Sequence, residues 1–356
     1  MTTTDLSTTA SADSESVDNR KNRSASITAG FRPGSFALRD AWFPVLQTVF
    51  IGRRPSLRVI HGRPIYLARE NGVLVATEDS PRDRDRGRLR ASEFTAGTGR
   101  YPVVERYGYA WVWYGDPANA SPDLVPRVPH LPEAGGLPRH FHQNVIFDCS
   151  YELICENLLD LTHADFLHSW LTGDPLSEHD EITVESTSET VTMTRTAVGR
   201  PTPKIQRGLA KSDTQDACLV TMVHVRSGVC LLHGDFNPGM SVRMLHPANP
   251  ETPGRTRTPV TYNVQHTTKL ARTVFPFSTH IVGGQDNWAV RPQNPLYLDR
   301  STDEKDMNSR FDAAGLRFRK VHQELVDRQR RGDYSYLADG DPGRDVTEQM
   351  RLERPR

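Results

Sequence analysis

The sequence predicts a chain of the α+β class with two domains, a small antiparallel β-sandwich followed by a curved antiparallel sheet that wraps around helices. Three observations support this prediction: two short hairpins in the N-terminal third, several β-like segments in the middle, and a helical pattern at about residues 302–331. With 356 residues the chain is long enough to build two hydrophobic cores.

The first predicted domain covers residues 37–133 and is marked by its turns. In PIYLARENGVLVATED, apolar and polar residues alternate on both sides of the Asn71-Gly72 dipeptide, which favours a two-residue hairpin turn. The pattern repeats around Tyr107-Gly108 in RYPVVERYGYAWVWYGD. Such short strands predict an antiparallel sandwich or barrel.

The second predicted domain covers residues 134–333. A linker rich in Pro and Gly, residues 118–138, precedes it, and a polar tail, residues 334–356, follows it. Between these limits, β-like segments such as ACLVTMVHV and TPVTYNVQH precede the helical pattern. One curved sheet packed on helices, with an internal cavity, accounts for this order.

Charge and composition exclude several classes of partner. Lys+Arg and Asp+Glu are balanced at 44 each, so there is no general electrostatic reason to expect nucleic acid or an anionic membrane. Residues 80–94 contain five arginines, but the interleaved Asp residues favour a solvated loop over a nucleic-acid site. Residues 1–36 are a polar, disordered leader without the apolar core of a secretory signal, and no apolar run could span a bilayer. We therefore expect a cytoplasmic protein.

The segment ENLLDLTHADFLHSW, residues 156–170, places polar side chains in an otherwise apolar helix that we predict for residues 152–170. His163 and His168 are five residues apart, which in a regular helix rotates the second ring by about 140° from the first. The rings converge only if the helix is irregular, with a π-type turn or a break near Ala164–Phe166. Two imidazoles and a carboxylate suit Fe(II) and leave positions open for dioxygen and substrate. The alternative is that both histidines are ordinary core or surface residues.

The same segment resembles the mononuclear-iron motif of Rieske-type non-haem iron oxygenases, in the branch that includes vanillate O-demethylase and dicamba monooxygenase. The resemblance covers about residues 37–330: LRDAWFPVL resembles the start of the family's N-terminal domain, and NPETPGRTRTPVTYNV resembles a longer form of a segment in its catalytic domain. It implies a Rieske-like sandwich, a catalytic domain of the helix-grip type and a mononuclear Fe(II) site.

The resemblance also assigns roles to residues of the motif. His163 and His168 match the two iron-binding histidines. Asp160 matches an acidic residue that links the iron to the neighbouring subunit's iron–sulfur cluster, although it could instead only anchor His163. Asn157 matches a residue close to the metal.

The third iron ligand is expected to be an Asp near the start of the last predicted helix. Asp303 fits best because Met307 and Phe311 follow it at helical spacing, and Asp306 is the alternative. Either residue could instead be solvent-facing or cap the helix. The candidates for the wall of the substrate pocket, each of which could instead be a core residue, are Phe236, His246, Tyr262 and Trp288.

One feature of the family is missing from the sequence. Relatives hold a [2Fe–2S] cluster in the N-terminal domain with two Cys and two His, in C-x-H and C-x-x-H pairs. Residues 1–148 contain no cysteine, and the four cysteines of the chain, none in a CxxC pair, are Cys149, Cys155, Cys218 and Cys230. We therefore predict that both cluster-binding loops are missing, that the chain holds no [2Fe–2S] cluster, and that its cysteines are buried thiols.

The resemblance implies an O2-dependent monooxygenase that hydroxylates or oxidatively demethylates a small ring-containing substrate. Electrons would come from a separate ferredoxin or reductase, or from a cluster-bearing oxygenase subunit, in a trimer or a hetero-oligomer. Two alternatives stay open. The chain could be an iron enzyme whose substrate supplies the electrons or that catalyses a non-redox reaction, or it could be a non-catalytic partner of a complete Rieske oxygenase.

Overall fold

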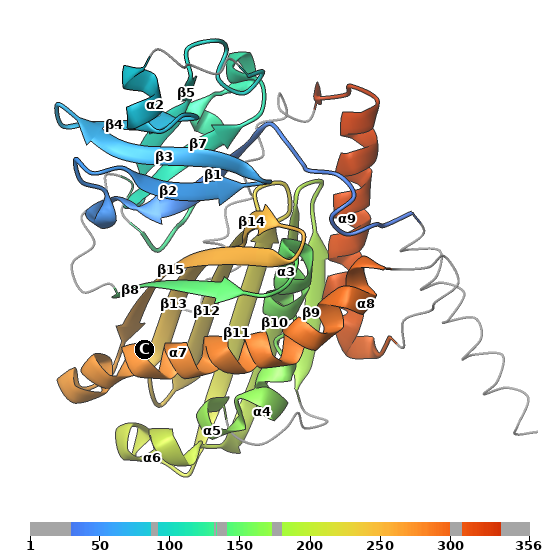
Figure 1. The fold of residues 1–356 in the computed structure, drawn as a ribbon. Coiled ribbons are helices and arrows are strands. Elements are labelled where there is room, and N and C mark those ends of the chain that lie inside the picture. The colour runs from blue at the N-terminus through green and yellow to red at the C-terminus, as the bar shows by residue number, and fades with distance from the viewer. Residues whose placement is uncertain are drawn as a thin grey trace, which may run out of the picture.

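The computed structural model describes residues 30–86, 92–131, 133, 141–172, 180–299 and 308–335. These residues form a small β-sandwich, drawn at the top of Figure 1, and a large curved sheet with helices below it. The predicted α+β class is confirmed, with strands and helices both extensive in the described part of the chain.

The sandwich consists of two antiparallel sheets, ordered β1-β7-β6 and β2-β3-β4-β5. Both predicted hairpins are confirmed, because Asn71-Gly72 joins β3 to β4, Tyr107-Gly108 joins β6 to β7, and all four residues have φ between 52° and 85°. The elements of the sandwich are β1 (Ala41–Gln47), η1 (Thr48–Phe50), β2 (Ser56–Ile60), β3 (Arg63–Glu70), β4 (Val73–Thr77), α2 (Pro81–Asp85), β5 (Arg100–Tyr101), β6 (Val103–Arg106) and β7 (Tyr109–Tyr114).

The large sheet has eight strands in the order β14-β15-β13-β12-β11-β10-β9, and β8 pairs with β15 outside this path. Every pairing in it is antiparallel. The strands are β8 (Phe141–Phe147), β9 (Glu181–Ser186), β10 (Thr190–Pro201), β11 (Thr214–His224), β12 (Val229–Asn237), β13 (Ser241–Pro247), β14 (Asn249–Thr252) and β15 (Arg255–Gln265).

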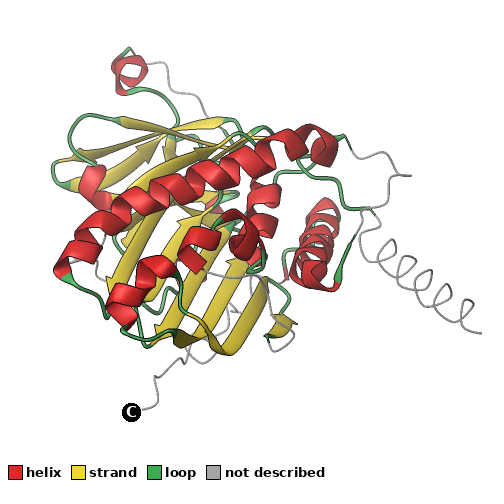
Figure 2. Ribbon diagram, turned by 90° about the horizontal axis from the view of Figure 1, so that it is seen from below, coloured by secondary structure: helices red, strands yellow, loops and turns green. Residues whose placement is uncertain are grey.

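The main helices cover one face of the large sheet (Figure 2). The longest, α7, runs across the strands, while α9 stands beside β9 and β10 (Figure 1). No helix in the described part of the chain is long and apolar enough to cross a membrane. The helices are α3 (Tyr151–Leu159), α4 (His163–Leu167), α5 (Ser169–Thr172), α6 (Lys204–Ala210), α7 (Lys269–Val290), α8 (Asn294–Leu298) and α9 (Ala313–Arg330), with short turns η2 (Pro117–Asn119), η3 (Pro122–Leu124), η4 (Arg291–Gln293) and η5 (Arg310–Asp312).

An aromatic cluster joins the sandwich to the large sheet. Trp42, Trp111 and Trp113 are at most 2% exposed and pack in one cluster with side chains of β11, β12 and β13. The predicted linker contributes to this cluster through Val125, Val128 and Leu131. Its described residues are therefore packed between the two parts.

The segment before β1 also packs against the second part. Phe31 is 1% exposed, and its ring lies edge-on to Tyr297 and His322 at centroid distances of 6.2 and 5.4 Å. This corrects the prediction that residues 1–36 are a disordered leader, because the buried ring of Phe31 anchors the end of that segment. Residues 1–29 and 336–356 lie outside the described part. The predicted buried thiols are confirmed for Cys149, Cys155 and Cys230, whereas Cys218 is partly exposed; all four are free.

Candidate metal centre

A break in the chain separates α3 from α4 at the start of the histidine motif. The Asp160 side chain accepts hydrogen bonds from the backbone N–H of Thr162 (2.8 Å) and from its hydroxyl (2.6 Å). This Asx-type turn gives the backbone an alternative to continuing the helix. The structure therefore replaces the single predicted helix of residues 152–170 by three short ones, and His163 is the first residue of α4.

A second irregularity follows at His168, the C-cap of α4. Its φ and ψ of −119° and 28° lie outside the helical range, so its ring is not rotated as in a continuous helix. The His163 and His168 rings approach to 5.4 Å between centroids at an interplanar angle of 79°. The predicted irregularity exists, but it lies at Asp160–Thr162 and His168 and not at Ala164–Phe166.

Both imidazoles are oriented by hydrogen bonds from Nδ1. The backbone carbonyl of Asp160 accepts one from His163, and the amide oxygen of Gln285 accepts one from His168 at 3.0 Å. Gln285 is itself held by the indole N–H of Trp170 at 3.1 Å. Because a carbonyl oxygen can only accept, each ring carries a proton on Nδ1. Nε2, which meets the Asp286 carboxylate, is therefore the nitrogen that a metal would bind in place of a proton.

The two Nε2 atoms converge on one carboxylate oxygen of Asp286, which α7 carries. The distances to Asp286 Oδ1 are 2.9 Å from His168 and 3.4 Å from His163. One ligand atom from each of the three residues lies within 4.8 Å of the other two. The side chains of His168 and Asp286 are 5% and 8% exposed, whereas that of His163 is 23% exposed.

Mutual attraction opposes burial at this centre. Burial alone lowers the pKa of His163, but hydrogen bonding and charge attraction from Asp286 outweigh it and raise that pKa above its usual value. For Asp286, burial raises the pKa, but the two histidines hold it well below its usual range. The carboxylate is therefore ionised and able to act as a ligand.

Two packing features keep α4 and α7 in place. Gly283 of α7 lies so close to β8 that a Cβ there would be 3.1 Å from Val145 Cγ1. On the other side, the buried Arg195 donates to the carbonyl of Leu161 (3.1 Å) and to Asp165 of α4 (2.5 Å). The centre therefore stands on two elements that are each tied to the large sheet.

The centre lies between an outer groove and an inner cavity. The groove, about 890 Å³, is bordered by α3, α4, α7, α8 and α9 and includes Asn157 and Asp160 among its lining residues. The cavity, about 170 Å³, lies between α7 and the large sheet. His163 borders both, whereas His168 and Asp286 border only the cavity. A ligand in the cavity would therefore lie directly beside the three converging side chains.

This donor set fits a divalent transition metal. Two neutral imidazoles and one carboxylate on one side of a metal form the facial arrangement that non-haem Fe(II) oxygenases use, with open positions for other ligands. Calcium and magnesium prefer shells of oxygen atoms alone. The carbonyl of Asp160 and the amide of Gln285 are the outer hydrogen-bond acceptors that metal-binding histidines usually have.

The carboxylate was not found from the sequence. The predicted third ligands, Asp303 and Asp306, fall in residues 300–307, outside the described part of the chain. The carboxylate that the structure brings to the histidines is Asp286. One signal could have indicated it, since Asp286 is the only acidic residue between Glu251 and Asp299.

The structure places the four residues predicted for the wall of the substrate pocket in different environments. Phe236 and His246 line the cavity. Tyr262 is fully buried one layer behind it, with its ring 5.5 Å from that of Phe275. Trp288 is 75% exposed, which corrects the prediction, because two residues after Asp286 the helix has turned by about 200° and points outward.

A family model describes the part of the chain that contains this centre. Residues 147–328 match the vanillate O-demethylase oxygenase C-terminal domain. The chain belongs to this family. The match includes the histidine motif, the strands β9 to β15 of the large sheet and α7 with Asp286. The resemblance to Rieske-type oxygenase catalytic subunits is thereby confirmed, and the loss of the cluster-binding loops stays a prediction.

Relatives in the family support the same assignment over shorter segments. A putative toluene-4-sulfonate monooxygenase iron-sulfur subunit from Comamonas testosteroni is 33% identical over 115 residues, 32% of this chain and 33% of the relative. A vanillate O-demethylase oxygenase subunit from Pseudomonas sp. is 37% identical over 94 residues, 25% of this chain and 26% of the relative. The matching segments thus span a third or less of these relatives' length.

The fold has a solved counterpart over most of its length. The crystal structure of dicamba monooxygenase bound to 3,6-dichlorosalicylic acid superposes with a TM-score of 0.67 and covers 82% of this chain and 98% of the other. The sequence identity is 19%, so this similarity establishes the fold. It confirms the predicted β-sandwich followed by a helix-grip domain.

Proposed function

We propose that this chain is the catalytic subunit of an iron-dependent oxygenase that inserts one oxygen atom of O2 into a small ring-containing substrate. His163, His168 and Asp286 would bind the Fe(II). The observation that carries the proposal is the convergence of two imidazole Nε2 atoms and one carboxylate oxygen beside an apolar cavity. A non-catalytic subunit would have no need to keep three side chains from α4, its C-cap and α7 in this arrangement.

Fe(II) bound by these three ligands would supply dioxygen activation at its open coordination positions. The chain's own residues prepare the site. Asp160 and Gln285 fix the two rings with Nε2 directed at Asp286. The apolar wall of the cavity excludes bulk water from a substrate that lies next to the centre, which limits side reactions.

The electrons would come from another protein. Monooxygenation consumes one O2, two electrons and two protons, and forms the hydroxylated product and one water. Residues 1–148 lack the cysteine thiolates that a [2Fe–2S] cluster needs. We therefore propose a separate ferredoxin or reductase, or a cluster-bearing oxygenase subunit, as the donor. A hetero-oligomer would bring such a donor close, although the trimer implied by the resemblance is also compatible.

The outer groove is the side from which we expect the electrons to arrive. It reaches His163, the most exposed of the three candidate ligands, and Asp160 lies at its edge. The Asp160 carbonyl is hydrogen-bonded directly to the His163 ring. Asp160 is therefore a positioning residue for His163 and a candidate contact for the donor.

Iron binding and oxygen consumption test this proposal together. The protein is purified anaerobically, reconstituted with Fe(II) and analysed for metal content and visible absorption. We expect about one iron per chain without iron–sulfur absorption, and oxygen uptake only when a reductant or reduced ferredoxin is added. No iron after reconstitution would favour a non-catalytic subunit. Oxygen uptake with substrate alone would favour an enzyme that takes its electrons from the substrate.

A further inference from the structure

The inner cavity has walls of nearly uniform chemical character. On the sheet side they are formed by apolar side chains, and Phe275 and Val282 of α7 complete the apolar wall. The residues on the sheet side include Leu219, Leu232, Phe236, Met240, Val242 and Met244. The only charged or ionisable groups among its described lining residues are Asp160, His246, the thiol of Cys230 and the three side chains of the candidate metal centre.

The hydroxyl groups of the wall already donate their protons to the protein. Thr221 donates to the carbonyl of Leu158 at 2.9 Å, and Ser278 donates to that of Phe275 at 2.7 Å. Thr279 lies 2.8 Å from the carbonyl of Pro276. A hydroxyl has one proton, so these three groups cannot stabilise an anion by donation without breaking a bond they already have.

His246 adds a polar group to the wall without adding a positive charge. Its Nε2 lies 3.3 Å from the sulfur of Met244. Burial lowers the pKa of His246 to about 4, against a smaller opposing effect of Asp286, so the ring is neutral near pH 7. A neutral imidazole has one N–H, and because a thioether sulfur can only accept, that N–H lies on Nε2 and Nδ1 is left as an acceptor.

Negative charge on a ligand would therefore be unbalanced in this cavity. None of its described lining residues is lysine or arginine, and Asp160 and Asp286 add negative charge on the side of the metal centre. A buried anion needs a cation or several donors to offset its lost hydration. Bound Fe(II) would be partly neutralised by Asp286 and would offset an anion only through one of its open positions.

We propose that the substrate is an uncharged compound with a single ring, and that the cavity rejects its carboxylate and sulfonate analogues. This inference rests on the proposed function, because it takes the ligand of the cavity to be the substrate of the oxygenase. The cavity volume of about 170 Å³ supports the size, since an engineered apolar cavity of roughly 150 Å³ binds benzene. The apolar walls favour the ring, and the neutral His246 adds no positive charge that would favour an anion.

Binding of two compounds of the same shape tests directly whether the cavity prefers an uncharged ligand to an anion. 4-Nitroanisole and 4-methoxybenzoate share the ring and the methoxy group and differ in that a nitro group replaces a carboxylate. Calorimetric titration at pH 7.5, with Fe(II)-loaded protein under anaerobic conditions, gives both affinities. We expect 4-nitroanisole to bind at least about 100-fold more tightly. Equal affinity, or tighter binding of the benzoate, would overturn the proposal.

A charge introduced into the wall gives a matched variant. Leu232 lines the cavity and is only partly buried, so a lysine there can adapt more easily than at a fully buried position. We expect Leu232→Lys to reverse the preference in favour of 4-methoxybenzoate, with Leu232→Met as the uncharged control. If Leu232→Lys does not fold, the wild-type titration still decides.

Failure of this inference and failure of the proposed function give different results. The same titrations with iron-free protein show whether the preference for the neutral compound depends on the metal. Selective binding of 4-nitroanisole by a protein that takes up no iron would support the preference of the cavity for an uncharged ligand and contradict the proposed oxygenase function. One iron per chain with preferential binding of the benzoate would contradict only the proposed preference of the cavity.

Discussion

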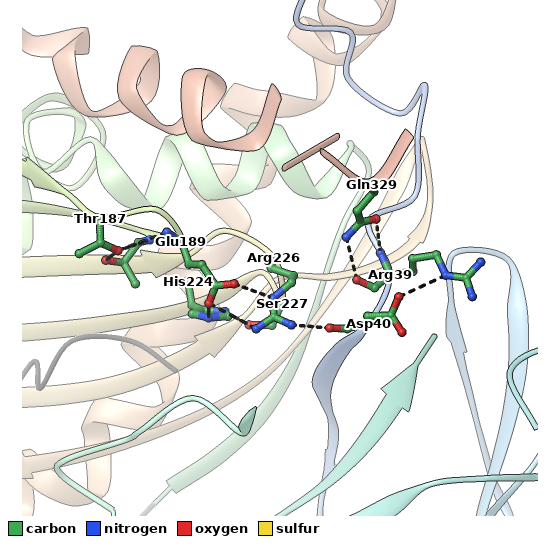
Figure 3. A network of polar contacts seen from close by, with 9 residues as sticks. Arg39, Asp40, Thr187, Glu189, His224, Arg226, Ser227 and Gln329 are labelled. Carbon is green, nitrogen blue, oxygen red and sulfur yellow. Dashed lines mark hydrogen bonds and ion pairs between the residues drawn. The ribbon is translucent and has the colours of Figure 1, made fainter. Parts of the chain in front are cut away.

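Two clusters in this molecule contain the same kinds of side chain and differ in what surrounds them. In the metal centre, His163 and His168 converge on Asp286 beside the groove and the cavity. In the second cluster, His224 and Arg226 share Glu189 (Figure 3), and none of these three lines the groove or the cavity. The second cluster ties the large sheet to the sandwich, because Arg226 donates to the carbonyl of Asp40 just before β1.

The carboxylates of both clusters are held ionised by their partners. Burial raises the pKa of Glu189, but hydrogen bonds and charge attraction from His224 and Arg226 lower it overall, as the histidines do for Asp286. The two clusters differ in the side chains that surround each carboxylate. An arginine cannot give up its proton to make room for a metal, and Ser227 occupies the second nitrogen of His224 at 2.6 Å. A histidine–carboxylate contact thus indicates a metal site only where imidazoles converge next to open space.

Glu152 is a third buried carboxylate and extends the comparison. It is 1% exposed and accepts a hydrogen bond from the backbone N–H of Gly34 at 2.9 Å. Burial is the largest influence on its pKa and raises it to about 7, and no cation is among the main influences. The three carboxylates therefore separate into one for a metal, one for an ion pair and one that is partly protonated at neutral pH.

The largest expected effect comes from removal of the converging imidazoles. The double variant His163→Ala, His168→Ala leaves one carboxylate, so we expect its iron content after anaerobic reconstitution to fall from about one per chain to below about one tenth. His224→Ala is the control and should keep its iron. Unchanged metal content in the double variant would show that the two clusters do not differ as described.

Glu189→Gln should change stability and not metal content. It leaves the buried Arg226 without its charged partner, so we expect the free energy of unfolding to fall by about 3–5 kcal/mol. Urea denaturation measures this loss, and metal analysis of the folded protein should still give the wild-type iron content. The control Glu324→Gln, which breaks the exposed pair with Lys320, should cost less than about 1 kcal/mol. Iron loss in Glu189→Gln would contradict a structural role.

Glu152→Gln should remove a pH dependence of stability. The pKa of Glu152 is raised from 4.5 in the unfolded chain to about 7 in the fold, so the folded state holds this proton more tightly. Its contribution is fully present below pH 4.5 and is lost as the pH rises to about 7. Between pH 5 and pH 8 we expect the wild type to lose about 2 kcal/mol relative to Glu152→Gln. Parallel stability curves for the two proteins would contradict the raised pKa.

The smallest effect is expected at Gln285, which orients His168 without being a ligand. Gln285→Leu keeps the size and removes the acceptor, so we expect Fe(II) affinity to fall by about 10–100-fold, measured by competition with a chelator. Asn287→Ala is the control, because that side chain bonds to Asp148 on the far side of the helix. Equal affinities of Gln285→Leu and the wild type would show that the Nδ1 hydrogen bond has no influence on the metal.

Local patterns in the sequence predicted much of the fold. The hairpin turns at Asn71-Gly72 and Tyr107-Gly108 follow from dipeptides that favour positive φ. The motif at His163 and His168 was found for a similar reason, because both residues belong to one short segment. The need for an irregular helix followed from their spacing alone, although its position did not.

The parts of the fold and of the site that the sequence did not predict depend on contacts between distant segments. Asp286 lies 118 residues after His168 in the chain and reaches it only because α7 packs across the sheet. Residues 269–290 also give a weak helical signal, since they contain Pro276 together with several glycine and β-branched residues. The outward position of Trp288 follows from the same helix. Because the sequence did not predict this helix, Asp286 was not among the candidate ligands and Trp288 was wrongly assigned to the pocket wall.

The identity of the third ligand tests the central claim most directly. Iron content after anaerobic reconstitution is measured for Asp286→Asn, with Asp303→Asn and Asp306→Asn as matched variants of the residues that the sequence suggested. The structure predicts that Asp286→Asn loses most of its iron and that the other two keep about one iron per chain. Full iron in Asp286→Asn, or loss of iron in either of the other variants alone, would contradict the metal centre described above.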